Sequence, residues 1–129
     1  MNPALVILVG RAFLSILFIV SGFGKLTGAA GFAGYLGSLG IPGGIAMAYL
    51  VGALEFFGGL AILVGFQTRI VAYVLALFTV GTILTAHMGD ATAAMKNLSI
   101  VGGFLVLGAV GAGAYSVDAR KGGATLARA

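Results

Sequence analysis

The stretch GGIAMAYLVGALEFFGGLAILVG, residues 43–65, decides the fold of this chain. At a helical rise of about 1.5 Å per residue, this run is long enough to cross a hydrocarbon layer of roughly 30 Å. A single acid, Glu55, lies near its middle. A lone carboxylate at that depth costs roughly 2.5 to 3.5 kcal/mol on insertion scales. We therefore expect a basic side chain from a neighbouring span to bind Glu55.

The whole chain shares this apolar character. Its 129 residues are 60% hydrophobic and 8% charged, whereas soluble domains are usually about 25% charged. The composition predicts one integral membrane domain in contact with the lipid bilayer. The net charge of +4 does not indicate nucleic-acid binding, because the basic residues are mostly spread singly, without a basic stripe and interleaved aromatic residues.

Residue usage narrows the chemistry. The chain has no cysteine, one histidine and three acids, so a metal site built from its own side chains is not expected. The sequence contains no nucleophile–base set, phosphate-binding loop or dinucleotide fingerprint. We expect no self-contained catalytic constellation and no covalently bound cofactor. An enzymatic role would be that of a subunit.

Four apolar runs predict an all-α, four-helix membrane bundle within residues 1–115. The link Gly65–Thr68 is so short that the helices on either side are expected to be antiparallel neighbours. Arg11 lies inside the first run rather than ahead of it, which favours a retained helix over a signal peptide. The expected helices cover about 3–26, 43–65, 69–88 and 97–115, followed by a flexible basic tail over 116–129.

The stretch from Thr27 to Pro42 is rich in glycine and leaves two interpretations open. Phe32, Tyr35 and Leu36 follow helical spacing, which favours a short interfacial helix. The many glycines equally favour a packed or re-entrant loop. The distribution of Lys and Arg in the short loops predicts that both termini are cytoplasmic.

Counting helical rise from the membrane edge predicts which polar groups share a level. Arg11 is placed about 10 Å deep and Glu55 about 15 Å deep, which makes Arg11 the first candidate partner and Arg69 the second. His87 and Lys25 are placed near the outer end, with Asp90 and Asn97 at a similar level. The candidate intramembrane site comprises Arg11, Lys25, Glu55, Arg69 and His87.

Each of these residues also has a structural interpretation. A Glu–Arg pair between helices can simply specify the packing arrangement. His87, at a helix end, is more often an interface residue than a ligand. Lys25 can extend its ammonium group to the lipid headgroups.

Several of these positions occur together in one known family. Arg11, the segment GFGKL at 22–26, GIP at 40–42, Glu55 followed by GGL at 58–60, and Thr68-Arg69 together resemble the DoxX family of small bacterial membrane proteins. This resemblance implies four spanning helices and an inner-membrane location. It also implies a link to quinone chemistry, because one member is described as a subunit of a thiosulfate:quinone oxidoreductase. The family motif positions would be Arg11, Lys25, Glu55 and Arg69.

We hypothesise that the protein is an accessory subunit of a quinone-linked oxidoreductase complex. Glu55 would accept a proton, Arg11 or His87 would hold a quinone carbonyl, and a partner subunit would bring the redox cofactor. One alternative is a non-catalytic scaffold or assembly factor that acts with partner subunits or as a homo-oligomer. Another is a carrier of protons or small solutes that uses Glu55 and His87.

Overall fold

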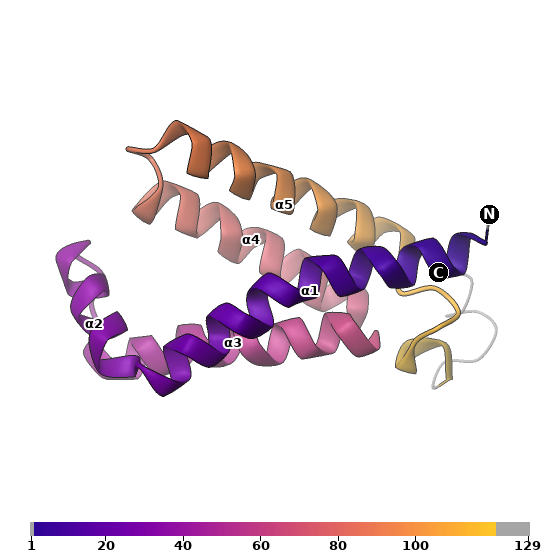
Figure 1. Ribbon diagram of the computed structural model, residues 1–129, viewed down its shortest axis with the longest axis horizontal. Helices are drawn as coiled ribbons and strands as arrows, with labels where there is room; N and C mark the ends of the chain where they lie inside the picture. The colour runs from indigo at the N-terminus through magenta and orange to yellow at the C-terminus, as the bar shows by residue number, and fades with distance from the viewer. Residues whose placement is uncertain (1, 121–129) are drawn as a thin grey trace.

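The protein is an all-helical bundle in a computed structural model that describes residues 2–120 (Figure 1). The helices are α1 (Pro3–Thr27), α2 (Ala29–Ser38), α3 (Gly44–Val64), α4 (Thr68–Ala86) and α5 (Ala91–Val110). All of them except α2 are long and apolar enough to cross a membrane. The predicted four-helix membrane fold is therefore confirmed, whereas the cytoplasmic placement of the termini stays a prediction.

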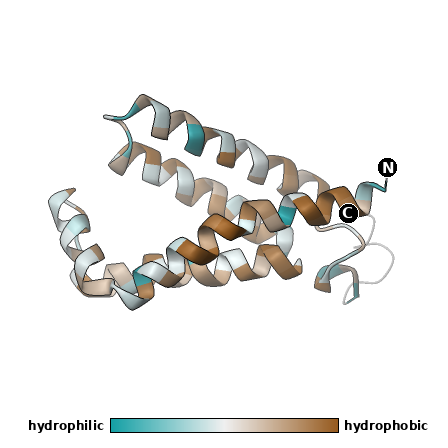
Figure 2. Cartoon of the chain, in the orientation of Figure 1, coloured by the Kyte–Doolittle hydropathy of each residue, from teal (hydrophilic) through white to brown (hydrophobic). Residues whose placement is uncertain are grey.

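The outer surface of the bundle is hydrophobic. Phe13 on α1 and Leu77 on α4 are 73% and 75% exposed, and Figure 2 shows hydrophobic residues along all four long helices. Such surfaces would be costly to expose to water but lie favourably against lipid chains. The inward faces carry the small and polar residues, as expected for helices that pack inside a bilayer.

Helices α1 and α3 pack backbone to backbone. A Cβ atom on Gly22 would lie 2.3 Å from the backbone nitrogen of Phe56, and one on Gly59 would lie 3.0 Å from the backbone nitrogen of Ile19. Only glycine allows such an approach, which is how small residues bring membrane helices together. Because both contacts involve backbone atoms, they determine how far α1 is shifted along α3.

The second pair is α4 and α5, an antiparallel hairpin. Phe18 of α1 contacts Phe104 of α5 edge to face, with ring centroids 5.3 Å apart, and these rings join Ile62 and Leu75 in the buried core. In Figure 1 the two helix pairs lie close together where α1 begins and separate toward α2.

Within residues 27–42, α2 forms a packed helix, which decides between the two interpretations of this stretch. Ala29 and Leu36 of α2 are buried in a small cluster with Ala48 of α3. The chain turns from α2 into α3 through Gly40 and Gly43, whose φ angles of 77° and 114° are readily adopted by glycine.

The last spanning helix, α5, begins six residues earlier than expected. Asp90 caps α5, because its carboxylate accepts a hydrogen bond from the backbone N–H of Ala93 at 3.1 Å. The segment 90–96 therefore contains the first turn of a helix rather than a polar link. The helix ends before Gly111, which has a φ of 84°.

The first residues of the expected flexible tail are bound to the bundle. The backbone N–H of Asp118 donates to the carbonyl of Gly65 at 2.9 Å. The Asp118 carboxylate accepts from the N–H groups of Gln67 and Thr68 at 2.7 and 2.9 Å. Residues 116–120 are thus held by the α3–α4 turn, and residues 121–129 lie outside the described part.

Replacing Asp118 with alanine is expected to lower the free energy of unfolding by about 1 kcal/mol, as for loss of a helix N-cap. Gln67 has a φ of 49°, so this turn depends on the carboxylate that binds it. Unfolding by SDS in mixed micelles, followed by circular dichroism, measures the effect. Asp118→Asn keeps one acceptor oxygen, so its free energy of unfolding should fall by less than that of the alanine variant. An equal decrease in both variants would contradict the capping role.

Candidate functional site

The buried acid has a cationic partner from a neighbouring span. The Lys25 ammonium on α1 donates a hydrogen bond to Oε1 of Glu55 on α3. The side chains are 24% and 8% exposed, respectively. Glu55 therefore lies inside the bundle, while Lys25 is partly open to its surroundings.

The partner is Lys25, so the prediction that Arg11 pairs with Glu55 is wrong. The depth count assumed that the start of the first span and the end of the second lie at the same level. The contact between Gly22 and Phe56 instead staggers α1 along α3. In this register Arg11, eleven residues before Gly22, is level with Gln67, eleven residues after Phe56.

Arg11 binds backbone carbonyls at the end of α3. Its Nε donates to Ile62 at 3.0 Å, and its Nη groups donate to Leu63 at 2.8 Å, Ala112 at 2.7 Å and Tyr115 at 2.9 Å. The side chain is 1% exposed. A helix leaves its last carbonyls unpaired, and a cation is favourable beside them. Arg11 thus joins the end of α3 to the segment after α5.

Arg69, the second candidate partner of Glu55, also binds a helix end. Its Nη1 donates to the carbonyls of Gly108 and Ala109 in the last turn of α5, at 3.0 and 2.7 Å. Both arginines therefore close the C-terminal ends of helices. The depth count also placed Lys25 near the outer end with His87 and away from Glu55, and this separation is wrong because Lys25 pairs with Glu55.

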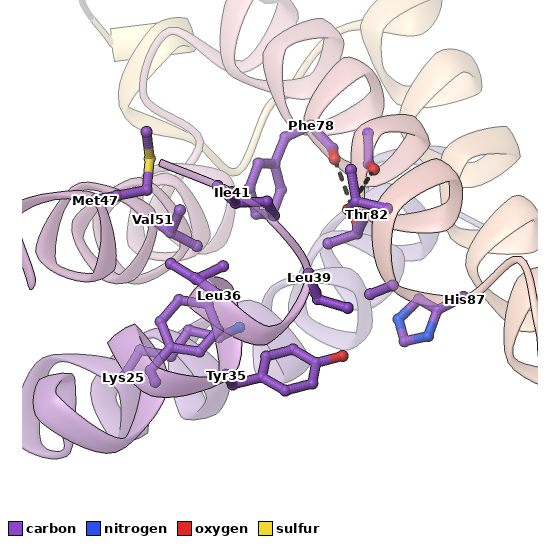
Figure 3. A pocket seen from close by; sticks show the side chains of 14 residues that line it. Lys25, Tyr35, Leu36, Leu39, Ile41, Met47, Val51, Phe78, Thr82 and His87 are labelled. Carbon is purple, nitrogen blue, oxygen red and sulfur yellow. Dashed lines mark hydrogen bonds between the residues drawn. The ribbon is translucent and has the colours of Figure 1, made fainter. Parts of the chain in front are cut away.

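A cavity of about 390 Å³ lies beside the ion pair, where the helix pairs separate. This volume is in the range of small-molecule sites. Figure 3 shows Lys25 and His87 on opposite sides, with Leu36 and Leu39 between them. Most lining side chains are apolar and come from α2, α3 and α4; the polar ones are Lys25, Tyr35, Thr82, Thr85 and His87.

Lys25 is the charged hydrogen-bond donor of the cavity, and the Tyr35 hydroxyl is a neutral one. The hydroxyls of Thr82 and Thr85 donate to carbonyls of their own helix, so they offer lone pairs only. An ammonium has three N–H groups, and Glu55 accepts one of them. The Lys25 nitrogen also lies 4.9 Å from the centroid of the Phe32 ring, a cation–π contact.

His87 follows the last turn of α4, where its backbone N–H donates to the carbonyl of Ile83 at 3.2 Å. Its side chain lines the cavity that Lys25 also lines. Asp90 and Asn97, which the depth count placed beside them, instead bind the first turns of α5.

Sequence reasoning missed the cavity and the contributions of Phe32 and Tyr35. It also missed a usable signal for the Lys25–Glu55 pair. Gly22 precedes Lys25 by three residues, and Gly59 follows Glu55 by four residues. Because the first two spans are antiparallel, matching Gly22 with Gly59 would have placed the lysine beside the acid.

Comparison with known proteins gives one family and several relatives. The family model DoxX matches residues 6–88. The inner membrane protein YqjF of Escherichia coli K12 is 49% identical over 87% of this chain and 88% of its own length. The inner membrane protein YphA of the same organism is 35% identical over 88% of this chain and 89% of its own length.

A third relative has a name that describes an activity rather than a location. The Bacillus subtilis protein called "Putative oxidoreductase CatD" is 37% identical over 60% of this chain and 57% of its own length. No solved structure gives a significant match.

Proposed function

Because this chain belongs to the DoxX family, we propose that it is an accessory subunit of a quinone-linked oxidoreductase complex in the bacterial inner membrane. The carrying observation is the apolar cavity of about 390 Å³ that presents the Lys25 ammonium. The oxidoreductase name of the Bacillus relative agrees with this reaction class.

The cavity residues suit a quinone headgroup, which is a flat apolar ring with two carbonyl oxygens. Lys25 donates a hydrogen bond to one carbonyl, and Glu55 holds the lysine in position. Leu36, Val51 and Phe78 enclose the ring. A bound quinone would supply electron and proton acceptance. The chain has no cysteine and one histidine, so in this proposal a partner subunit contributes the redox centre that delivers the electrons.

Purification in mild detergent, followed by mass spectrometry of proteins and lipids, tests the proposal. We expect oxidoreductase subunits and a quinone to copurify, and added quinone to raise the melting temperature. Absence of quinone, together with an unchanged melting temperature on its addition, would contradict the proposal.

The second candidate function is a non-catalytic scaffold or assembly factor. One observation favours it: Arg11, Lys25, Glu55 and Arg69 each bind a group within the chain. In that case partners copurify without quinone. Glu55→Gln would then change stability or partner capture, while ligand binding would play no part.

Filling the cavity provides a sharper test. Gly81 lines the cavity, and a Cβ atom on it would meet nothing within 4 Å. Gly81→Leu should therefore fold normally while its side chain occupies the ligand space. We expect quinone affinity, measured from the melting temperature at a series of quinone concentrations, to fall by at least about tenfold.

Gly24→Leu is the matched control. A Cβ atom on Gly24 likewise meets nothing within 4 Å, and Gly24 does not line this cavity. The control should keep the quinone affinity of the unmodified protein. Equal affinities in the two variants would place the quinone elsewhere.

A further inference from the structure

We infer that the cavity selects a neutral carbonyl compound over an anion of the same size, and that Glu55 determines this selectivity. The inference rests on the proposed function in that it concerns the same cavity. It adds that the ligand head is uncharged, and it assigns the selectivity to Glu55, which does not itself line the cavity.

The first step is the charge at the Lys25 side. Lys25 lines the cavity, whereas the described lining residues include no Asp or Glu. The charge of Lys25 is balanced from behind by Glu55, its ion-pair partner. The hydrogen-bond donor that lines the cavity therefore belongs to an ion pair whose net charge is zero. Tyr35 and the threonine hydroxyls add no formal charge, and Figure 3 shows His87 on the far side of the cavity.

The second step compares two ligand heads at this position. A carbonyl oxygen accepts a hydrogen bond from an ammonium N–H and leaves the local charge at zero; such charge-assisted bonds are strong. An anionic head would add a third charge beside Glu55 in an apolar environment. It would lose its hydration, and repulsion by the Glu55 carboxylate would offset its attraction to the Lys25 ammonium, so little electrostatic gain compensates the lost hydration in an apolar environment.

The third step is that Glu55 cannot move away when a ligand arrives. Its side chain is 8% exposed, and its neighbour Phe56 makes the backbone contact with Gly22 described above. The negative charge therefore stays behind Lys25. In Glu55→Gln the amide oxygen still accepts from Lys25 but carries no charge, so the ammonium would attract an anion.

Two probes with the same dodecyl tail test this inference: 2-tetradecanone, which is neutral, and dodecane-1-sulfonate, which stays ionised at neutral pH. Binding of each labelled probe is measured on protein in phosphatidylcholine nanodiscs, with empty nanodiscs subtracted. We expect the unmodified protein to bind the ketone at least about tenfold more tightly than the sulfonate. Glu55→Gln should reverse this order, and Glu55→Asp should keep it.

An unchanged preference in Glu55→Gln, or tighter binding of the sulfonate by the unmodified protein, would overturn the inference. If Glu55→Gln does not fold, the double variant Lys25→Met/Glu55→Met removes both charges together. It should bind the ketone about tenfold more weakly and still reject the sulfonate. Undiminished ketone affinity in the double variant would equally overturn the inference.

A third probe, a decyl-substituted benzoquinone, separates this inference from the proposed function. Quinone binding with no effect of Glu55→Gln on the ketone–sulfonate preference would overturn the inference alone. The Glu55-dependent preference without quinone binding would overturn the quinone-linked function alone. Failure to bind any of the three probes would overturn both.

Discussion

Replacing Arg11 with methionine is expected to lower the free energy of unfolding by about 3 to 5 kcal/mol, because several carbonyls lose their donor at once and each orphaned acceptor costs roughly 1 to 3 kcal/mol when buried. Arg11 bonds to four carbonyls that join the end of α3 to the segment after α5. Unfolding by SDS in mixed micelles, followed by circular dichroism, measures the loss. Arg11→Lys should lose nearly as much, since an ammonium cannot reproduce the guanidinium geometry.

Arg120→Met is the matched control for loss of a positive charge. Arg120 is exposed, and its replacement should change stability by no more than about 0.5 kcal/mol. The same measurement separates Arg11 from Glu55. The effects of Arg11→Met and Glu55→Gln should add within about 0.5 kcal/mol, because the two side chains share no contact in this register. A clearly larger coupling would restore the direct pairing that the structure rejects.

Replacing Gly22 with alanine is expected to destabilise the bundle by about 2 to 3 kcal/mol, as overpacking of a close contact does. The added Cβ atom would lie 2.3 Å from the backbone nitrogen and 2.7 Å from the Cα of Phe56. Backbone atoms cannot rotate aside, so α1 and α3 must separate. That separation would also draw Lys25 away from Glu55. The same SDS unfolding experiment measures the loss.

Gly24→Ala tests whether the close contact, rather than any change at a helical glycine, causes this loss. A Cβ atom on Gly24 meets nothing within 4 Å. Alanine is the better helix former by about 1 kcal/mol in water, so this variant should be neutral or slightly more stable. Similar destabilisation by both substitutions would show that the Gly22–Phe56 contact does not determine the packing of α1 on α3.

The sequence patterns predicted correctly those features that depend only on residues close together in the chain. The apolar runs located the first three spans to within two residues, whereas α5 (Ala91–Val110) begins six residues and ends five residues before its predicted bounds. That start was missed because Asp90 was interpreted as part of a polar link, whereas its carboxylate caps the helix. The stretch containing Phe32 and Leu36 stayed ambiguous for a related reason: its many glycines weaken a helix that packing against Ala48 nevertheless stabilises.

The candidate site was predicted in part. All five candidate side chains have polar or cavity contacts, but they do not form one cluster. Lys25 and His87 line the cavity, and Glu55 lies behind Lys25. Arg11 and Arg69 instead donate hydrogen bonds to backbone carbonyls at the ends of α3 and α5. Residue type identified the groups that need partners, but it could not say which carbonyl or carboxylate each would find.

By itself, the sequence determined that the chain is a membrane bundle of four spans in which Glu55 needs a cation. Hydropathy can be summed residue by residue along the chain, and the cost of burying a charge depends only on the residue type and its depth in a span. Only the tertiary structure decided that this cation is Lys25 and that a cavity opens beside it. The reason is that the shift of α1 along α3 comes from backbone contact at Gly22, a short-range steric effect between distant segments that no count along one helix contains.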